Sequence, residues 1–238
     1  MGDVALVRTM TSRDLDWFQA LLAARGPGRL LVAPWFWAPA LDASVRHAEW
    51  LRQLLDDADV LAVRTAHGGV IATPAGTGVD IDDFAVDEPG RYEIDGCVLL
   101  ETIRRRRPGT PIRVVVPLHE SERLALVQSF DWLALTEVWW TRPLEGADRL
   151  SDPTVPRGGH PEVCSVQGMA GSLVMPPPVY QQKRPVLVLR DVPSSAALHE
   201  AERWAASRGA ACVCVIATPR DDWSDVGYLK TTGFFTAN

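Results

Sequence analysis

Long apolar runs are missing from this sequence. It has no stretch of about 18 uninterrupted apolar residues, the length that a membrane-spanning helix requires. Its first residues, Met1-Gly2-Asp3-Val4, also lack the basic stretch followed by an apolar one that marks an export signal. We therefore expect a cytoplasmic protein that does not cross a membrane.

Lysine is scarce, and the acidic residues outnumber the basic ones. Lys183 and Lys230 are the two lysines among 24 basic residues, and the formal net charge is −6. A broad positive surface for nucleic acid or anionic lipid is therefore not expected. The basic run Arg104 to Arg107 falls at the end of an expected helix, where it complements the carbonyl end of the helix dipole.

Motifs of several enzyme classes are also absent. The four cysteines show no metal-ligand spacing, and Cys212 and Cys214 alternate on an apolar strand pattern typical of buried thiols. The sequence has no Gly-x-Ser-x-Gly turn, no Walker-type phosphate loop and no Cys/His pair at nucleophile spacing. These absences argue against a hydrolase, a nucleotidase and a metal site.

What is present is the pattern of an ordinary globular protein. Of the 238 residues, 47% are hydrophobic and 23% are charged, enough for a sizeable core. Along the first 145 residues, helical and strand periodicities predict the order strand, two helices, three strands, helix, strand, helix, strand. The expected elements are strand 4–7, a helix from residue 12, helix 42–55, strands 59–65, 70–74 and 79–86, helix 95–106, strand 112–116, helix 119–130 and strand 132–140.

A second segment repeats part of this order. Residues 143–159 are rich in proline, glycine and aspartate and are the best linker candidate. Beyond them we expect three strands, a helix, a strand, a short helix around residues 225–231 and a final strand at Phe234-Phe235. The predicted organisation is a complete α/β domain over 1–145, a linker over 146–160 and a copy over 161–238 that lacks the opening strand and two helices.

One loop carries a family resemblance. Arg91 and Gly96 precede a helix with the paired leucines Leu99 and Leu100. Together with the element order, this resembles the GNAT acyltransferase superfamily, whose phosphate loop reads Arg or Gln, two residues, Gly, one residue, Gly or Ala. Ile94 stands at the inner glycine, where a branched side chain would intrude on a pyrophosphate. The resemblance implies a mixed-sheet α/β fold in a degenerate tandem arrangement.

The resemblance also implies a co-substrate, acetyl-CoA or another acyl-CoA. It places this molecule beside the strand residues Phe84, Ala85 and Val86, with its phosphates at Arg91 and Gly96.

Three residues are candidates for proton transfer. Asp82 and Asp83 lie on the strand where the family commonly has the base that deprotonates an amine, and they face opposite sides of the sheet. Tyr228, five residues before a Gly-Phe pair, matches the family's acid toward the leaving thiolate. The alternatives are solvated charges at the strand edge for the acids and a packing role for the tyrosine.

An aromatic run marks the candidate acceptor site. Trp35, Phe36 and Trp37 occupy the connection between the first two expected long helices, where the family builds acceptor-binding surface. They indicate an apolar or aromatic small molecule, unless the rings only seal the core.

The leading hypothesis is a GNAT-like N-acyltransferase of small-molecule metabolism. It would move an acetyl or acyl group from acyl-CoA to a small, apolar amine. The oligomeric state stays open, with a homodimer as one alternative. Two alternatives stay open: a GNAT-fold protein that performs another reaction, such as cyclisation or decarboxylation, and a non-catalytic binding subunit.

Overall fold

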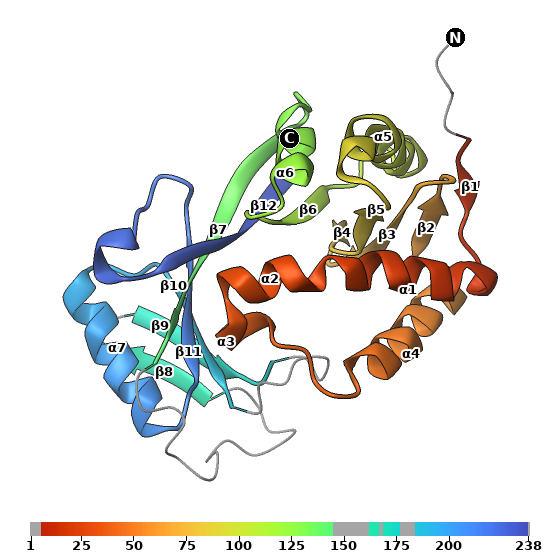
Figure 1. The fold of residues 1–238 in the computed structure, drawn as a ribbon. Helices are drawn as coiled ribbons and strands as arrows, with labels where there is room; N and C mark the ends of the chain where they lie inside the picture. Colours follow the sequence, from red (N-terminus) through yellow and green to blue (C-terminus); the bar gives the residue numbers. More distant parts are fainter. Residues whose placement is uncertain (1–5, 145–161, 167–168, 177–183, 238) are drawn as a thin grey trace. The chain divides into compact units, whose positions relative to one another are not determined.

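Two units make up the chain. The computed structural model describes residues 6–144, 162–166, 169–176 and 184–237 (Figure 1). Unit 1 comprises Met1–Gly28, Ser44–Thr136 and Gly233–Asn238, and unit 2 comprises Arg29–Ala43 and Glu137–Thr232. The predicted linker, 146–160, lies outside the described residues. The assignment of 29–43 to unit 2 and of 233–238 to unit 1 has no counterpart in the predicted boundaries.

A mixed sheet forms the centre of unit 1. Its strands are β1 (Arg8–Thr9), β2 (Leu61–Arg64), β3 (Gly68–Ala75), β4 (Gly78–Ile81), β5 (Phe84–Val86) and β6 (Ile112–Pro117). Strands β1 to β4 are antiparallel neighbours, β6 pairs with β4 in parallel, and β5 pairs with β3. The ends of β7 (Leu133–Pro143) and β12 (Leu229–Ala237) also belong to this unit.

The strand expected at 79–86 is interrupted. Asp80 pairs with Thr73 and Phe84 pairs with Val70, so four steps along this strand match three steps along β3. One residue is therefore inserted, and Asp82 and Asp83 form a bulge between β4 and β5. The last pair between β4 and β6 is Ile81 with Val114. Beyond it, β5 pairs with β3 only, while β6 continues to Pro117. The two parallel strands thus part at the bulge.

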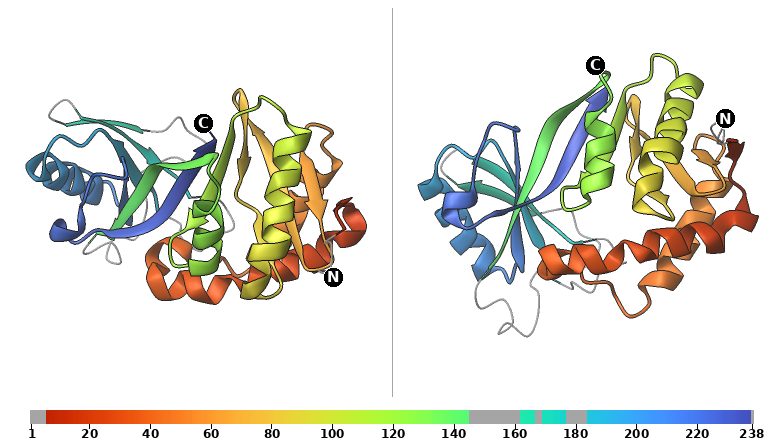
Figure 2. Two further views of the ribbon diagram at one scale, coloured as in Figure 1. Left: turned by 90° about the horizontal axis from the view of Figure 1, so that it is seen from above. Right: turned by 45° about the horizontal axis from the view of Figure 1, so that its top comes forward.

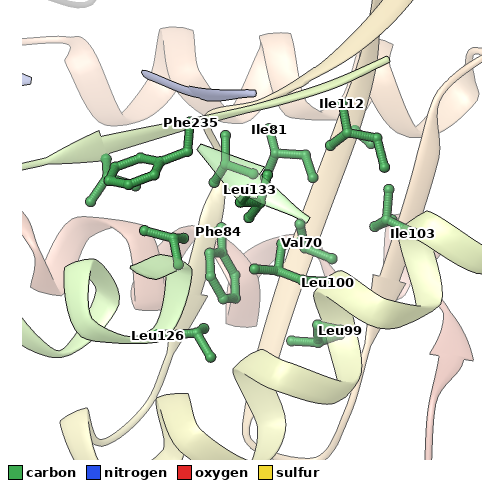
Figure 3. Close-up of a cluster of buried hydrophobic side chains, with 14 of the residues drawn as sticks. Val70, Ile81, Phe84, Leu99, Leu100, Ile103, Ile112, Leu126, Leu133 and Phe235 are labelled. Atoms are coloured by element: carbon green, nitrogen blue, oxygen red, sulfur yellow. The ribbon is translucent and has the colours of Figure 1, made fainter. Parts of the chain in front are cut away.

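Two pairs of helices cover the unit 1 sheet. On one face lie α1 (Leu15–Ala24) and α4 (Ala43–Asp56), which bury Phe18 and Leu51 against Ile71 and Ala85. On the other lie α5 (Cys97–Arg106) and α6 (Ser121–Gln128), which Figure 2 shows in yellow and green. Figure 3 shows the Phe84 ring among Leu99, Leu100 and Leu126 in the core beneath these helices.

Among the described residues, five neighbouring strands make up the sheet region of unit 2. It runs in the order β7, β11 (Cys212–Ala217), β10 (Val186–Arg190), β9 (Met169–Val174) and β8 (Glu162–Val166). Its central pair, β10 and β11, is parallel and connected by α7 (Ser195–Ser207), and the side chain of Ser194 accepts a hydrogen bond from Ala197 N. The short helix α3 (Pro34–Trp37) carries the aromatic run and follows α2 (Gly26–Val32), which belongs to this unit from Arg29 onward.

The thiols of Cys212 and Cys214 are buried and free, as predicted. Burial raises the pKa of Cys212 to about 12 and that of Cys214 further still. These cysteines are packing residues.

One local prediction, at residues 225–231, is wrong. Residues 225–231 are not a helix: one turn at Ser224–Val226 ends at Gly227, whose φ is 83°, and the chain enters β12 at Leu229. A left-handed glycine ends a helical turn, and the adjacent Thr231 and Thr232 favour a strand. The first helix, α1, ends at Ala24, and Gly26-Pro27-Gly28 opens a separate short helix, α2, since proline is compatible with the first turn of a helix.

The described residues give two further findings. None of their helices has the length and apolarity to span a bilayer. No three His, Cys, Asp or Glu side chains among them are grouped as metal ligands.

We expect Leu100→Ala to lower the free energy of unfolding by roughly 2–5 kcal/mol, since the side chain is fully buried and its removal leaves a cavity. Val45→Ala, at an exposed site on α4, should change it by less than about 0.5 kcal/mol. Urea unfolding followed by circular dichroism measures both. Equal effects would contradict the position of Leu100 in the core.

Candidate functional site

The bulge brings a carboxylate and an imidazole together. Asp83 faces the side of the sheet covered by α1 and α4, and its Oδ1 lies 3.7 Å from Nε2 of His47 on α4. The His47 ring stacks on Trp50, with ring centroids 5.7 Å apart. Asp82 is exposed, and the next residue on its side, Phe84, belongs to the core under α5 and α6. The two acids therefore face opposite sides, as the strand periodicity predicted.

A buried ionic cluster holds the parting strands. The cluster consists of Arg25 at the end of α1, Glu120 before α6, and Arg123 within α6. Arg25 donates from Nε and Nη2 to the Glu120 carboxylate at 2.9 and 2.8 Å, and from Nη1 to Phe84 O at 3.1 Å. Arg123 Nη1 lies 3.4 Å from Glu120 Oε2.

Arg123 spans the point where the strands separate. Its Nη2 donates to Asp82 O at 3.1 Å and to Val115 O at 2.6 Å, one carbonyl from each strand. Its side chain is 0% exposed, and its guanidinium lies 5.2 Å from the centroid of the Phe84 ring. The guanidinium thus donates hydrogen bonds to two backbone carbonyls that have no partner on the opposite strand once the strands separate.

The two arginines of the cluster stay protonated despite their burial. Burial, and then the neighbouring Arg25, lower the pKa of Arg123 to about 10. Burial also acts to lower the pKa of Arg25, but the charges of Glu120, Tyr92 and Asp82 outweigh it and raise that pKa. Both arginines are therefore cations at neutral pH, and Glu120 lies between them.

The candidate phosphate loop is a closed helical segment. Residues Tyr92–Gly96 form a π-helical turn that continues into α5, and the amide of Arg91 donates to Glu88 O. Arg91 Nε lies 3.3 Å from Oδ2 of Asp95, whose residue is 1% exposed. This cation is thus paired within its own turn.

Gly96 is packed rather than open. A Cβ there would lie 2.7 Å from Leu126 Cδ2 and 3.1 Å from Phe84 Cζ. This glycine makes room for core side chains. The side chain of Ile94, at the motif's inner glycine position, is 47% exposed.

These residues fit an acyl-CoA in one part only. The bonds Ile71 N to Asp83 O and Asp87 N to His67 O point toward β3, so by strand alternation the peptide groups of Phe84 and Val86 point the other way. That edge can pair with the amides of a pantetheine arm. The 91–96 segment, helical and acidic, does not fit the diphosphate.

Tyr228 is bound inside unit 2. Its hydroxyl donates to Glu202 Oε1 at 2.8 Å, and Arg142 Nη1 lies 3.3 Å from the same oxygen. The residue is 2% exposed, and burial, then the Glu202 charge, raise its pKa well above the usual value. This environment suits a structural hydroxyl better than a proton donor to a substrate.

The tryptophans of the aromatic run also lie in unit 2. Trp35 packs on the β10–β11 face together with Trp139 and Cys214, and the guanidinium of Arg29 lies 5.4 Å from the Trp37 ring centroid. Phe36 belongs to α3, and its side chain lies outside the described set. The predicted acceptor residues are thus in a different unit from Asp82 and Asp83.

The parallel strands of unit 2 stay together. Strands β10 and β11 pair at every position from Val186 with Cys212 to Arg190 with Ile216. A cavity of about 420 Å³ lies at the end of β10, and none of the predicted site residues lines it. Its lining residues are Val163, Met169, Ala170, Gly171, Ser172, Val188, Arg190 and Asp191.

Sequence reasoning missed His47 and the ionic cluster. Arg123 stands three and four residues before the buried Leu126 and Val127, on the apolar side of its helix. A charged residue at the spacing of the apolar positions was the sequence signal that could have revealed Arg123. No sequence signal pointed to His47, because its partner, Asp83, lies far away in the sequence.

No protein-family model matches the chain, and no curated protein sequence matches it significantly. Among solved structures, a proposed acetyltransferase from Pyrococcus horikoshii aligns with a TM-score of 0.52 at 10% identity, covering 100% of this chain and 90% of that one. A GCN5-related N-acetyltransferase from Sphaerobacter thermophilus gives 0.51 at 12% identity, covering 99% and 96%. The resemblance is confirmed at the level of the fold: the chain has the GNAT fold of the N-acetyltransferases.

Proposed function

We propose that the chain is an N-acyltransferase that moves an acyl group from a CoA-type thioester to a small amine. We assign the reaction to unit 1, at the Asp82-Asp83 bulge. The fold supports acyl transfer as a class of reaction, but a fold alone does not identify a site. The pairing of Asp83 with His47 is the observation that carries the assignment.

This pair has the chemistry that amine acylation requires. An amine must lose a proton before or as it attacks a thioester, and imidazole and carboxylate groups are the usual acceptors. His47 is partly exposed, so its ring can receive the proton from a substrate. The imidazolium formed would lie beside the Asp83 carboxylate. This negative charge would stabilise the imidazolium, as the aspartate of a catalytic triad stabilises the protonated histidine.

The surface next to this pair suggests the acceptor. Trp50 stacks on His47 and is 41% exposed. An aromatic face beside the base favours a small amine with an apolar or aromatic part. This surface replaces Trp35 and Trp37, which lie in unit 2, as the proposed acceptor contact.

Asp83→Asn should lower kcat for amine acetylation by about 100-fold or more, because the imidazolium loses its counter-charge. Thiol release from acetyl-CoA with a panel of small amines measures it. Asp87→Asn is the matched control: Asp87 pairs with His67 at 2.9 Å on the exposed surface of the same unit. Loss of activity in both variants, or in neither, would contradict the assignment.

Tyr228→Phe should leave kcat within about twofold and lower the free energy of unfolding by roughly 1–2 kcal/mol, since Glu202 loses a buried donor. Thermal unfolding and the thiol-release assay separate the two effects. A large loss of kcat without a loss of stability would assign the acid role to this tyrosine instead.

A further inference from the structure

The segment that should hold the donor's diphosphate offers it few groups. The amides of Arg91 and Tyr92 donate to Glu88 O and Pro89 O, so they belong to helical turns. Gly96, which would allow a close approach, is filled by contacts with Leu126 and Phe84. A diphosphate needs convergent N–H donors at such a turn, and the amides of Arg91 and Tyr92 are already engaged.

The charge of the segment is also unfavourable. Residues 87–96 contain four acids, Asp87, Glu88, Glu93 and Asp95, and one base, Arg91. That base is paired with Asp95 at 3.3 Å. A diphosphate placed here would meet a net negative segment, and like charges in proximity repel.

The strand edge is a different kind of surface. The peptide groups of Phe84 and Val86 point away from β3, on the side where β6 has separated. Arg25 already donates to Phe84 O, which has a second lone pair. Backbone groups bind an amide-containing arm through hydrogen bonds and require no charge on the ligand.

We infer that this site recognises its acyl donor through the pantetheine arm and the thioester, and that the nucleotide diphosphate adds little to binding. The inference rests on the proposed acyl transfer and narrows the donor to the pantetheine thioesters as a class. Acetyl-pantetheine, which lacks the nucleotide, should therefore serve about as well as acetyl-CoA.

The test compares the two thioesters on the full chain. We expect their kcat/KM values to agree within about fivefold, and 3′,5′-ADP to give no inhibition at millimolar concentration. Calorimetry with pantetheine and with CoA provides a readout independent of turnover. Since the segment is acidic, added salt should lower the KM for acetyl-CoA or leave it unchanged.

A restored motif provides the control variant. Ile94→Gly returns the inner glycine at an exposed position and should leave the ratio of the two kcat/KM values unchanged, because the segment remains helical and acidic. Gly96→Ala should lower the melting temperature by several degrees and leave that ratio unchanged as well.

The outcomes separate the two proposals. A preference for acetyl-CoA above about fivefold, or inhibition by 3′,5′-ADP, would overturn this inference and leave acyl transfer intact. Failure to bind or turn over either thioester with any amine would overturn the proposed function, and this inference with it.

Discussion

The buried guanidinium of Arg123 is the contact on which the architecture of unit 1 depends. Where β4 and β6 part, the carbonyls of Asp82 and Val115 can no longer bond to a neighbouring strand, and a buried unpaired carbonyl is costly. A guanidinium has five donors in a rigid fork and can serve both carbonyls at once. Its charge must then be balanced inside the protein, and Glu120 does so while also pairing with Arg25.

This cluster links the helices to the bulge. Arg25 comes from the end of α1 and bonds to Phe84 O, so it fixes β5 directly after the inserted residue. With Phe84 held on one side, strand alternation directs Asp83 toward α4 and His47. A reaction centre needs groups held within a fraction of an ångström, and buried charge pairs of this kind lock their neighbours at a cost in desolvation.

Sequence periodicity predicted much of this framework and missed its decisive details. Leu99 and Leu100 lie in the core, and the two acids face opposite sides, because both properties follow from local spacing. A period of two does not reveal one inserted residue, so the split of the 79–86 strand was not predicted. Arg123 was missed because a charged residue in a helix ordinarily faces solvent, and its partners are carbonyls of distant strands.

Comparison of the two units explains why the reaction is assigned to unit 1. Parallel strands that part leave peptide groups available to a ligand, whereas strands that stay paired use those groups on each other. In unit 2, β10 and β11 remain paired to Arg190 and Ile216, and Tyr228 is committed to Glu202. The shortened copy thus carries residue types of the motif, but its parallel strands do not separate beside them. Unit 1 has the separation together with an altered motif, and the proposed acyl transfer relies on this backbone geometry to pair with a pantetheine arm.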